Sequence, residues 1–138
     1  MRRIVFLFIT FFLFLFFGCS DKGQVMDGNT MLNSYHQISQ EEAARMMEKD
    51  DGHVIVDVRR QNEYDAGHIP GAILIPNESI RDTQPEALPD QNQIILIYCR
   101  SGNRSKQAAQ KLSDMGYTNV YELGGIIDWT GEVVAESK

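Results

Sequence analysis

Cysteine is scarce in this 138-residue chain, which has only two, Cys19 and Cys99. The two could form one disulfide, but it would tie a reactive loop to a predicted flexible tail, so we do not expect it. Histidine is scarce too, and His36 and His53 have no partners at the spacing of metal ligands, so no metal site is expected. The body of the chain therefore offers a single thiol, and the sequence implies no cofactor.

Positive charge is also in short supply. The chain has 13 lysines and arginines against 19 acidic residues, which gives a net charge of −6. Loss of residues 1–18 would remove two arginines and no acidic residue, and the net charge would become −8. So acidic a chain is not expected to bind nucleic acid or an anionic lipid surface. Arg100 and Arg104 are a local exception to this negative overall charge. We expect the protein to be a monomer.

Phenylalanine is absent beyond residue 17, because all seven lie in the one long apolar run, residues 4–17. That run is shorter than the ~20 residues of a membrane-spanning helix. Together with the charged start at Arg2 and Arg3, it is typical of the core of a signal peptide. The sequence therefore predicts a signal peptide over residues 1–18.

The apolar run ends at Gly18-Cys19, which resembles the cleavage site of bacterial lipoproteins, where the cysteine is lipidated and becomes the new N-terminus. Phe16 and Phe17 depart from the usual pattern at this site. We expect a lipid on Cys19 that anchors the protein outside the cytoplasm on a bacterial membrane, in the periplasm or at the cell surface. The alternatives are a retained membrane anchor and ordinary cleavage that leaves a free Cys19.

Two parts follow this signal. Residues 19–35 include a polar stretch rich in Gly and Asn, which predicts a flexible tether. Residues 36–138 predict one α/β domain, because short apolar strands alternate with helices. Strands are expected over 53–58, 72–75, 94–98 and 120–123, helices over 39–49, 61–66, 104–115 and 126–129, and a turn at Gly124-Gly125.

This alternation predicts a mainly parallel central sheet flanked by helices. In such sheets, ligands bind at the carboxyl ends of the strands. Cys99 stands at one such end, and Asp57 and Arg59 stand at another. The sequence therefore predicts a site at this edge of the sheet.

Between a predicted strand and a predicted helix lies the run Cys99-Arg100-Ser101-Gly102-Asn103-Arg104-Ser105. At such a turn, backbone N–H groups and the helix dipole converge on an anion, and they also lower the pKa of a thiol. A buried structural cysteine is the alternative, but the arginines and small residues favour a nucleophile. Four residues separate Cys99 from Arg104, one fewer than in a phosphatase loop of the Cys-(x)5-Arg kind, so the loop suits a single sulfur atom.

The chain contains three recognisable motifs, which are Asp57-Val58-Arg59 with Glu63-Tyr64 and Gly67-His68-Ile69-Pro70-Gly71-Ala72, the loop Tyr98 to Ser105, and Leu123-Gly124-Gly125-Ile126-Ile127-Asp128-Trp129. Together they resemble the motifs of single-domain rhodaneses, which are thiosulfate sulfurtransferases. The resemblance covers roughly residues 36–134. The chain departs from the family after the tryptophan, where Gly131-Glu132-Val133 has no proline.

The resemblance implies a rhodanese-like fold and a ping-pong reaction. The Cys99 thiolate would attack the outer sulfur of thiosulfate, sulfite would leave, and the Cys99 persulfide would pass its sulfur to a thiol or to cyanide. Arg100 and Arg104 would hold the anionic donor, and the backbone N–H groups of the loop would stabilise the sulfur anions. An arginine directly after the cysteine resembles the thiosulfate-using branch of the family.

Other residues have structural interpretations. We expect Asp57 and Arg59 to support the scaffold, His68 to make a structural hydrogen bond, and Trp129 to plug the core under a short helix. Two further functions stay open. One is a non-catalytic sulfur relay or binding module, and the other is a cysteine-dependent phosphatase or arsenate reductase, which the loop spacing disfavours.

Overall fold

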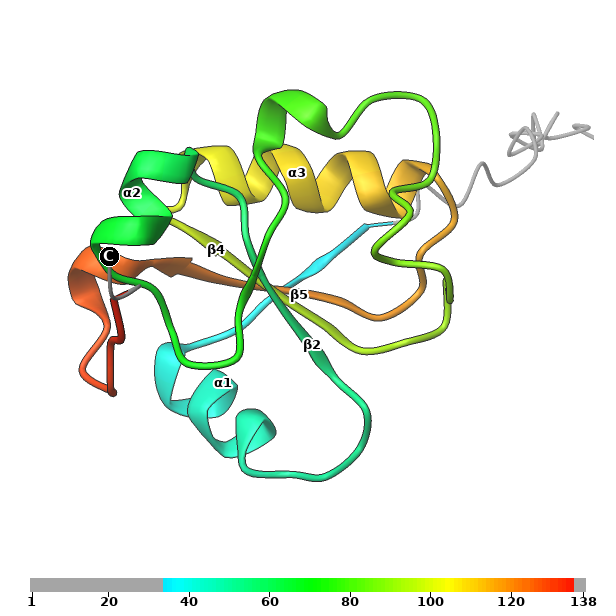
Figure 1. Ribbon diagram of the computed structural model, residues 1–138. Coiled ribbons are helices and arrows are strands. Elements are labelled where there is room, and N and C mark those ends of the chain that lie inside the picture. The colour runs from blue at the N-terminus through cyan, green and yellow to red at the C-terminus, as the bar shows by residue number, and fades with distance from the viewer. Residues whose placement is uncertain (1–33, 136–138) are drawn as a thin grey trace, which may run out of the picture. The chain divides into compact units, whose positions relative to one another are not determined.

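The computed structural model describes residues 34–135, which form a parallel sheet of five strands with helices on both faces (Figure 1). The strands are β1 His36–Gln37, β2 Val54–Asp57, β3 Ile73–Leu74, β4 Ile95–Cys99 and β5 Val120–Gly125. The helices are α1 Gln40–Met47, α2 Gln61–Ala66 and α3 Asn103–Asp114, with short 3-10 helices η1 Asn77–Ser79 and η2 Ile126–Asp128. The strand order is β1-β5-β4-β2-β3, so β4 is central. The predicted fold class is confirmed.

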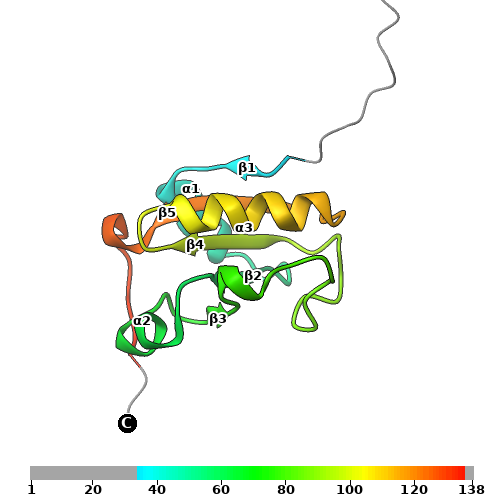
Figure 2. The ribbon, with the colours of Figure 1, turned by 90° about the horizontal axis from the view of Figure 1, so that it is seen from above.

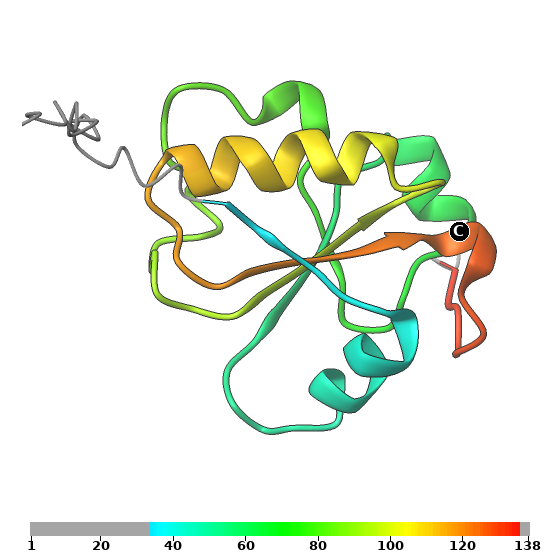
Figure 3. The ribbon, with the colours of Figure 1, turned by 180° about the vertical axis from the view of Figure 1, so that it is seen from behind.

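The side chains of β4 are buried along its whole length and alternate between the two faces of the sheet. Ile95, Ile97 and Cys99 belong to the apolar layer under α3. Leu96 and Tyr98 belong to the layer on the α1 side. Figure 2 shows α3 lying along β4 and β5, and Figure 3 shows α1 on the other face. Cys99 therefore points into the layer between the sheet and α3.

The predicted strands and helices are present, and their ends lie within two residues of the expected positions. The sequence did not predict β1, an edge strand of two exposed polar residues that pairs with β5 at Tyr121 and Glu122. Its pairing depends on backbone hydrogen bonds at a sheet edge, and no apolar alternation marks it in the sequence.

The prediction of a turn at Gly124-Gly125 is wrong, because both glycines belong to β5. Gly125 pairs with Cys99 across an irregularity in the β4–β5 register. A Cβ atom on Gly125 would lie 2.2 Å from the carbonyl oxygen of Arg100. The glycine is therefore needed for close approach of two backbones, whereas the sequence pattern suggested that it was needed for a reversal of the chain.

Within residues 34–135, no helix is long and apolar enough to cross a membrane. The predicted signal peptide, the predicted lipid site at Cys19 and nearly all of the predicted tether lie outside the described residues, and they stay predictions.

Candidate active site

Cys99 is the last residue of β4, and its side chain is only 1% exposed. After it the chain turns at Gly102, whose φ of +97° is a conformation that glycine adopts without strain, and α3 begins at Asn103. This turn places the amide nitrogen of Gly102 3.0 Å from the sulfur of Cys99. The hydroxyl oxygen of Ser105, one turn into α3, lies 3.5 Å from the same sulfur. The loop therefore folds around the sulfur atom.

The surroundings of Cys99 favour its thiolate. Burial is the strongest single influence and opposes ionisation. The hydroxyl of Ser105 and the backbone N–H groups of Ser105, Ser101 and Gly102 act in the opposite direction and together outweigh it. The pKa of Cys99 consequently lies below that of an ordinary thiol, which is the condition for a cysteine to act as a nucleophile.

The loop side chains that the sequence singled out lie in three different surroundings. Arg100, Ser101 and Asn103 are exposed, Arg104 is half-buried, and Ser105 is fully buried. The contacts with the sulfur come from the Ser105 hydroxyl and from backbone amides of the loop, and the amide of Gly102 is at 3.0 Å. Contact of the arginines with a substrate stays a prediction.

Behind the loop lies a buried carboxyl group, that of Glu122 on β5, which is 3% exposed. Its Oε1 accepts a hydrogen bond from the hydroxyl of Ser105 at 2.6 Å and another from the amide of Gly124 at 2.9 Å. Sequence reasoning missed this residue. The signal was an acidic residue in the middle of an otherwise apolar strand, between Tyr121 and Leu123.

The side chain of Arg104 is held by Glu63 of α2, a residue that the sequence analysis quoted only as part of a motif. Two parallel hydrogen bonds, both of 2.8 Å, join the guanidinium to the two carboxylate oxygens. Such a bidentate pair fixes the direction of the arginine as well as its position. It also ties α2 to the start of α3, and so closes one side of the loop.

A cavity of about 320 Å³ opens beside this pair. Its lining contains three arginines and a single acidic residue, namely Arg60, Arg100, Arg104 and Glu63, together with Asn62. In a chain of net charge −6, this is a local positive site at the carboxyl edge of the sheet. The arrangement can attract and hold a small anion next to the loop of Cys99.

Replacement of Glu63 by glutamine is expected to destabilise the fold by about 1–2 kcal/mol near neutral pH. The hydrogen bond from Arg104 is the main reason that the pKa of Glu63 falls from 4.5 to about 2. Because the folded pKa is lowered, the stabilisation is complete above the unfolded pKa and is lost as pH falls through the folded one. Urea denaturation should show the difference between wild type and Glu63→Gln shrinking from about pH 4.5 towards pH 2.

The exposed residue Glu86 provides the control for this experiment, and Glu86→Gln should leave stability within about 0.5 kcal/mol of wild type at every pH. If Glu63→Gln lost as much stability near pH 2 as at pH 7, the ion pair with Arg104 would not be the source of the stabilisation.

Asp57 and Arg59 form a buried ion pair at the end of β2, with exposures of 0% and 6%. The Nε and Nη2 atoms of Arg59 both donate to the carboxylate, at distances of 2.6–3.0 Å. Nη2 also donates to the carbonyl of Gly67 at 2.6 Å. The pair thus joins the strand end to the segment after α2, which is the geometry expected of a scaffold.

His68 and His53 make local contacts. The ring of His68 stacks on Tyr64 at 3.7 Å between centroids, and its Nδ1 lies 2.9 Å from the carbonyl oxygen of Tyr64. His53 pairs with Asp51 at 2.7 Å. Among residues 34–135, no group of three or more His, Cys, Asp or Glu side chains is placed to hold a metal ion.

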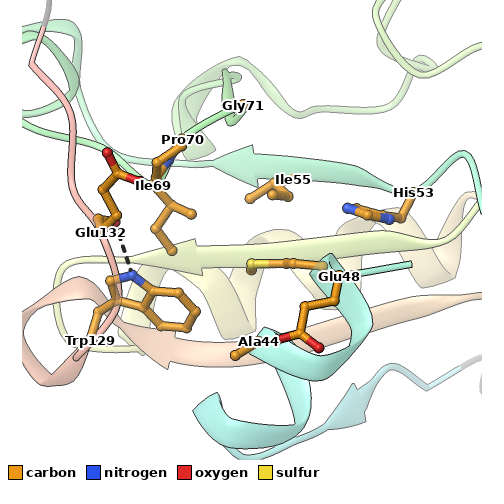
Figure 4. Close-up of a pocket in the computed structure, with 10 residues that line it drawn as sticks. Ala44, Glu48, His53, Ile55, Ile69, Pro70, Gly71, Trp129 and Glu132 are labelled. Atoms are coloured by element: carbon orange, nitrogen blue, oxygen red, sulfur yellow. Dashed lines mark hydrogen bonds between the residues drawn. The ribbon is translucent and has the colours of Figure 1, made fainter. Parts of the chain in front are cut away.

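The interpretation of Trp129 as a core plug is only partly right. The indole packs against the apolar layer on the α1 side of the sheet, but it is half-buried and its Nε1 donates to the carbonyl of Glu132 at 3.2 Å. Figure 4 shows the indole beside Ile69 at one end of a cavity of about 570 Å³ that extends to His53. The ring is not enclosed because this cavity lies against it. Cys99 does not line the cavity.

Comparison with known proteins places this geometry in a family. Residues 39–132 match the family described as "Rhodanese-like domain". Thiosulfate sulfurtransferase PspE of Escherichia coli is 41% identical over 73 residues, which are 53% of this chain and 70% of that protein. YrkF of Bacillus subtilis, described as a putative sulfur carrier protein, is 35% identical over 72% of this chain but over only 54% of its own length.

A solved structure shows the same fold. It is a rhodanese with anions from E. coli, with 37% identity and a TM-score of 0.56. The match covers 61% of this chain and 99% of that one.

Proposed function

This chain belongs to the rhodanese-like domain family, and we propose that it is a sulfurtransferase in which Cys99 carries the transferred sulfur. The observation that supports the proposal most strongly is the loop itself. The sulfur of Cys99 accepts a hydrogen bond from the amide of Gly102 at 3.0 Å, and Arg100 and Arg104 of the same loop line a positive cavity. A nucleophile next to an anion site is what transfer from a small anionic sulfur donor requires.

We propose thiosulfate as the donor. The Cys99 thiolate attacks the outer sulfur, an S–S bond forms at Cys99, and the S–S bond of thiosulfate breaks. Sulfite leaves with the electron pair of that bond, and the negative charge of the thiolate passes to the outer sulfur of the persulfide. A thiol or cyanide acceptor then takes this sulfur and restores the thiolate. No step needs a general base once Cys99 is ionised.

The two loop arginines have different parts in this proposal. The Nη1 and Nη2 atoms of Arg104 each donate to Glu63, so Arg104 shapes the rim of the cavity. Arg100 is exposed on the same cavity, and within residues 34–135 its guanidinium has no ion pair. Arg100 is therefore the arginine available to hold the donor and the departing sulfite.

Persulfide formation can be tested by mass spectrometry on the full chain, reduced and then treated with thiosulfate. The tryptic peptide of residues 82–100, in which Cys99 is the only cysteine, should gain the mass of one sulfur atom and lose it on addition of cyanide. Cys99→Ser should gain nothing. The chain's other cysteine supplies the matched control, because Cys19→Ser should gain sulfur as wild type does. An unchanged mass in wild type would refute the proposal.

A sulfur relay is the second candidate, favoured by the similarity to the putative sulfur carrier YrkF. Cys99 is the only cysteine among residues 34–135, so a persulfide there cannot be released as an internal disulfide within this part of the chain. Repeated turnover of thiosulfate with cyanide supports the enzyme. One stable persulfide per chain, without turnover, supports the relay.

We further propose that Cys19 is lipidated and holds the domain on the outer side of a bacterial membrane. The support is in the sequence, which has an apolar run at residues 4–17 that ends at Gly18-Cys19. Mass spectrometry of the N-terminal peptide from isolated membranes tests this. A free thiol on Cys19 would refute it.

A further inference from the structure

The hydroxyl group of Ser105 has one proton and several competing acceptors. The Oε1 atom of Glu122 lies 2.6 Å from the hydroxyl oxygen, the carbonyl oxygen of Gly102 lies at 3.0 Å, and the sulfur of Cys99 lies at 3.5 Å. A hydroxyl donates to one acceptor at a time. The shortest bond is also the one to a carboxylate, and such charge-assisted bonds are the stronger ones. In the resting site the proton is therefore drawn mainly towards Glu122, and the hydrogen bond to the sulfur is the weaker one.

The placement of Glu122 makes this competition effective. The side chain is 3% exposed and enters the loop from the β5 side, beneath the start of α3. Its Oε1 is held by the amide of Gly124 at 2.9 Å, so the carboxylate cannot swing away from Ser105 without losing that bond. A negative charge fixed on the far side of Ser105 also disfavours a second negative charge on Cys99.

Building on the proposed sulfurtransferase function, we propose that Glu122 is a positioning residue for Cys99. It draws the Ser105 hydroxyl proton towards its own Oε1, so that the hydrogen bond from Ser105 to the sulfur is weaker than it would be without Glu122. The thiolate is thereby kept more basic, and a more basic thiolate is a stronger nucleophile towards a sulfur donor. No bond is made or broken by Glu122, which acts mainly through Ser105.

The elements around Cys99 carry other charged groups, and these differ from Glu122 in their partners. Arg100 follows Cys99 directly, and Arg104 lies on α3. On α2, Glu63 is neutralised by Arg104, and on β2, Asp57 is neutralised by Arg59. On β1, His36 stacks on Tyr121, away from the loop. Glu122 is the carboxylate that shares a hydrogen-bond donor with the sulfur.

The test is a titration of the Cys99 thiolate by its ultraviolet absorbance, on the full chain in mild detergent, with Cys99→Ser as the baseline for each variant. Glu122→Gln keeps the size of the side chain but removes its charge. We expect the titration midpoint of Cys99 to fall by about one pH unit. Glu48→Gln, which alters a glutamate on the cavity of Figure 4, should leave the midpoint unchanged.

A double variant shows whether the effect passes through Ser105. In a Ser105→Ala background, Glu122→Gln should shift the midpoint by less than half as much as it does in wild type. An unchanged midpoint in Glu122→Gln would overturn the proposal, and so would a full shift that persists without Ser105. Because the titration needs no sulfur donor, its result is independent of whether the chain transfers sulfur.

A measurement on the wild-type chain covers the case in which these variants do not fold. The side-chain carboxyl carbon of Glu122, followed by NMR, should change its chemical shift as Cys99 ionises, because the Ser105 proton is then shared with the sulfur. A resonance that does not respond to the Cys99 titration would overturn the proposal.

Discussion

Gly125→Ala is expected to lower the rate of sulfur transfer at least about a hundredfold and to destabilise the fold by about 3 kcal/mol. A Cβ atom at this position would lie 2.2 Å from the carbonyl oxygen of Arg100 and 2.6 Å from the Cα of Ser101. Both atoms belong to the backbone of the loop, so no side chain can move aside. The loop must shift as a whole, and its amides then no longer point at the sulfur of Cys99.

The φ angle of Gly125 is −115°, which any residue can adopt, so the predicted effect comes from the lack of space alone. Gly52→Ala is the matched control. Gly52 has a φ of +75° and open space around its Cα, so its replacement should cost about 1 kcal/mol and leave transfer unchanged. Initial rates of sulfur transfer measure the first effect, and urea denaturation measures the loss of stability. Transfer by Gly125→Ala at a rate near that of wild type would contradict the close approach of β5 to the loop.

Asp57→Ala is expected to destabilise the protein by about 3–5 kcal/mol. The substitution leaves the guanidinium of Arg59, which is 6% exposed, without the carboxylate that accepts its hydrogen bonds. The loss exceeds the contribution of the pair itself, because the buried guanidinium has lost its hydration and keeps the carbonyl of Gly67 as an acceptor but no carboxylate.

Chemical denaturation should show this loss as a lower midpoint with an unchanged slope. The control is Asp51→Ala, which removes the more exposed carboxylate beside His53 and should leave the denaturation midpoint close to that of wild type. The double variant Asp57→Ala/Arg59→Met should recover much of the stability, since it removes both charges. No recovery would mean that Asp57 stabilises the strand end by other contacts.

Local patterns in the sequence were sufficient for most of the fold. The apolar run before Cys99 predicts the central strand, and the small residues after it predict the turn into α3. These features are encoded by neighbouring residues, so periodicity and turn chemistry reveal them. The proposed role of Cys99 rests on the same short stretch.

What the sequence did not reveal are contacts between distant segments. Glu63 lies 41 residues before Arg104, and Glu122 lies 17 residues after Ser105. No local pattern predicts which carboxylate will meet which partner, because the pairing is set by the order of strands in the sheet. Gly125 was misinterpreted for the same reason, since the backbone that it approaches belongs to the loop after β4.

The strand order also has a consequence for how the protein acquires its active thiol. β1 pairs with β5, so residues 36 and 121 must meet, and β4 pairs with β5 and β2 on its two sides. Parallel pairings between distant segments have a high contact order and form slowly. The loop around Cys99 packs against Gly125 of β5, so the amides of the loop reach their final positions only when the last strand has docked. A lowered pKa of Cys99 therefore reports that folding is complete. A chain truncated before residue 120 should contain a cysteine of ordinary reactivity.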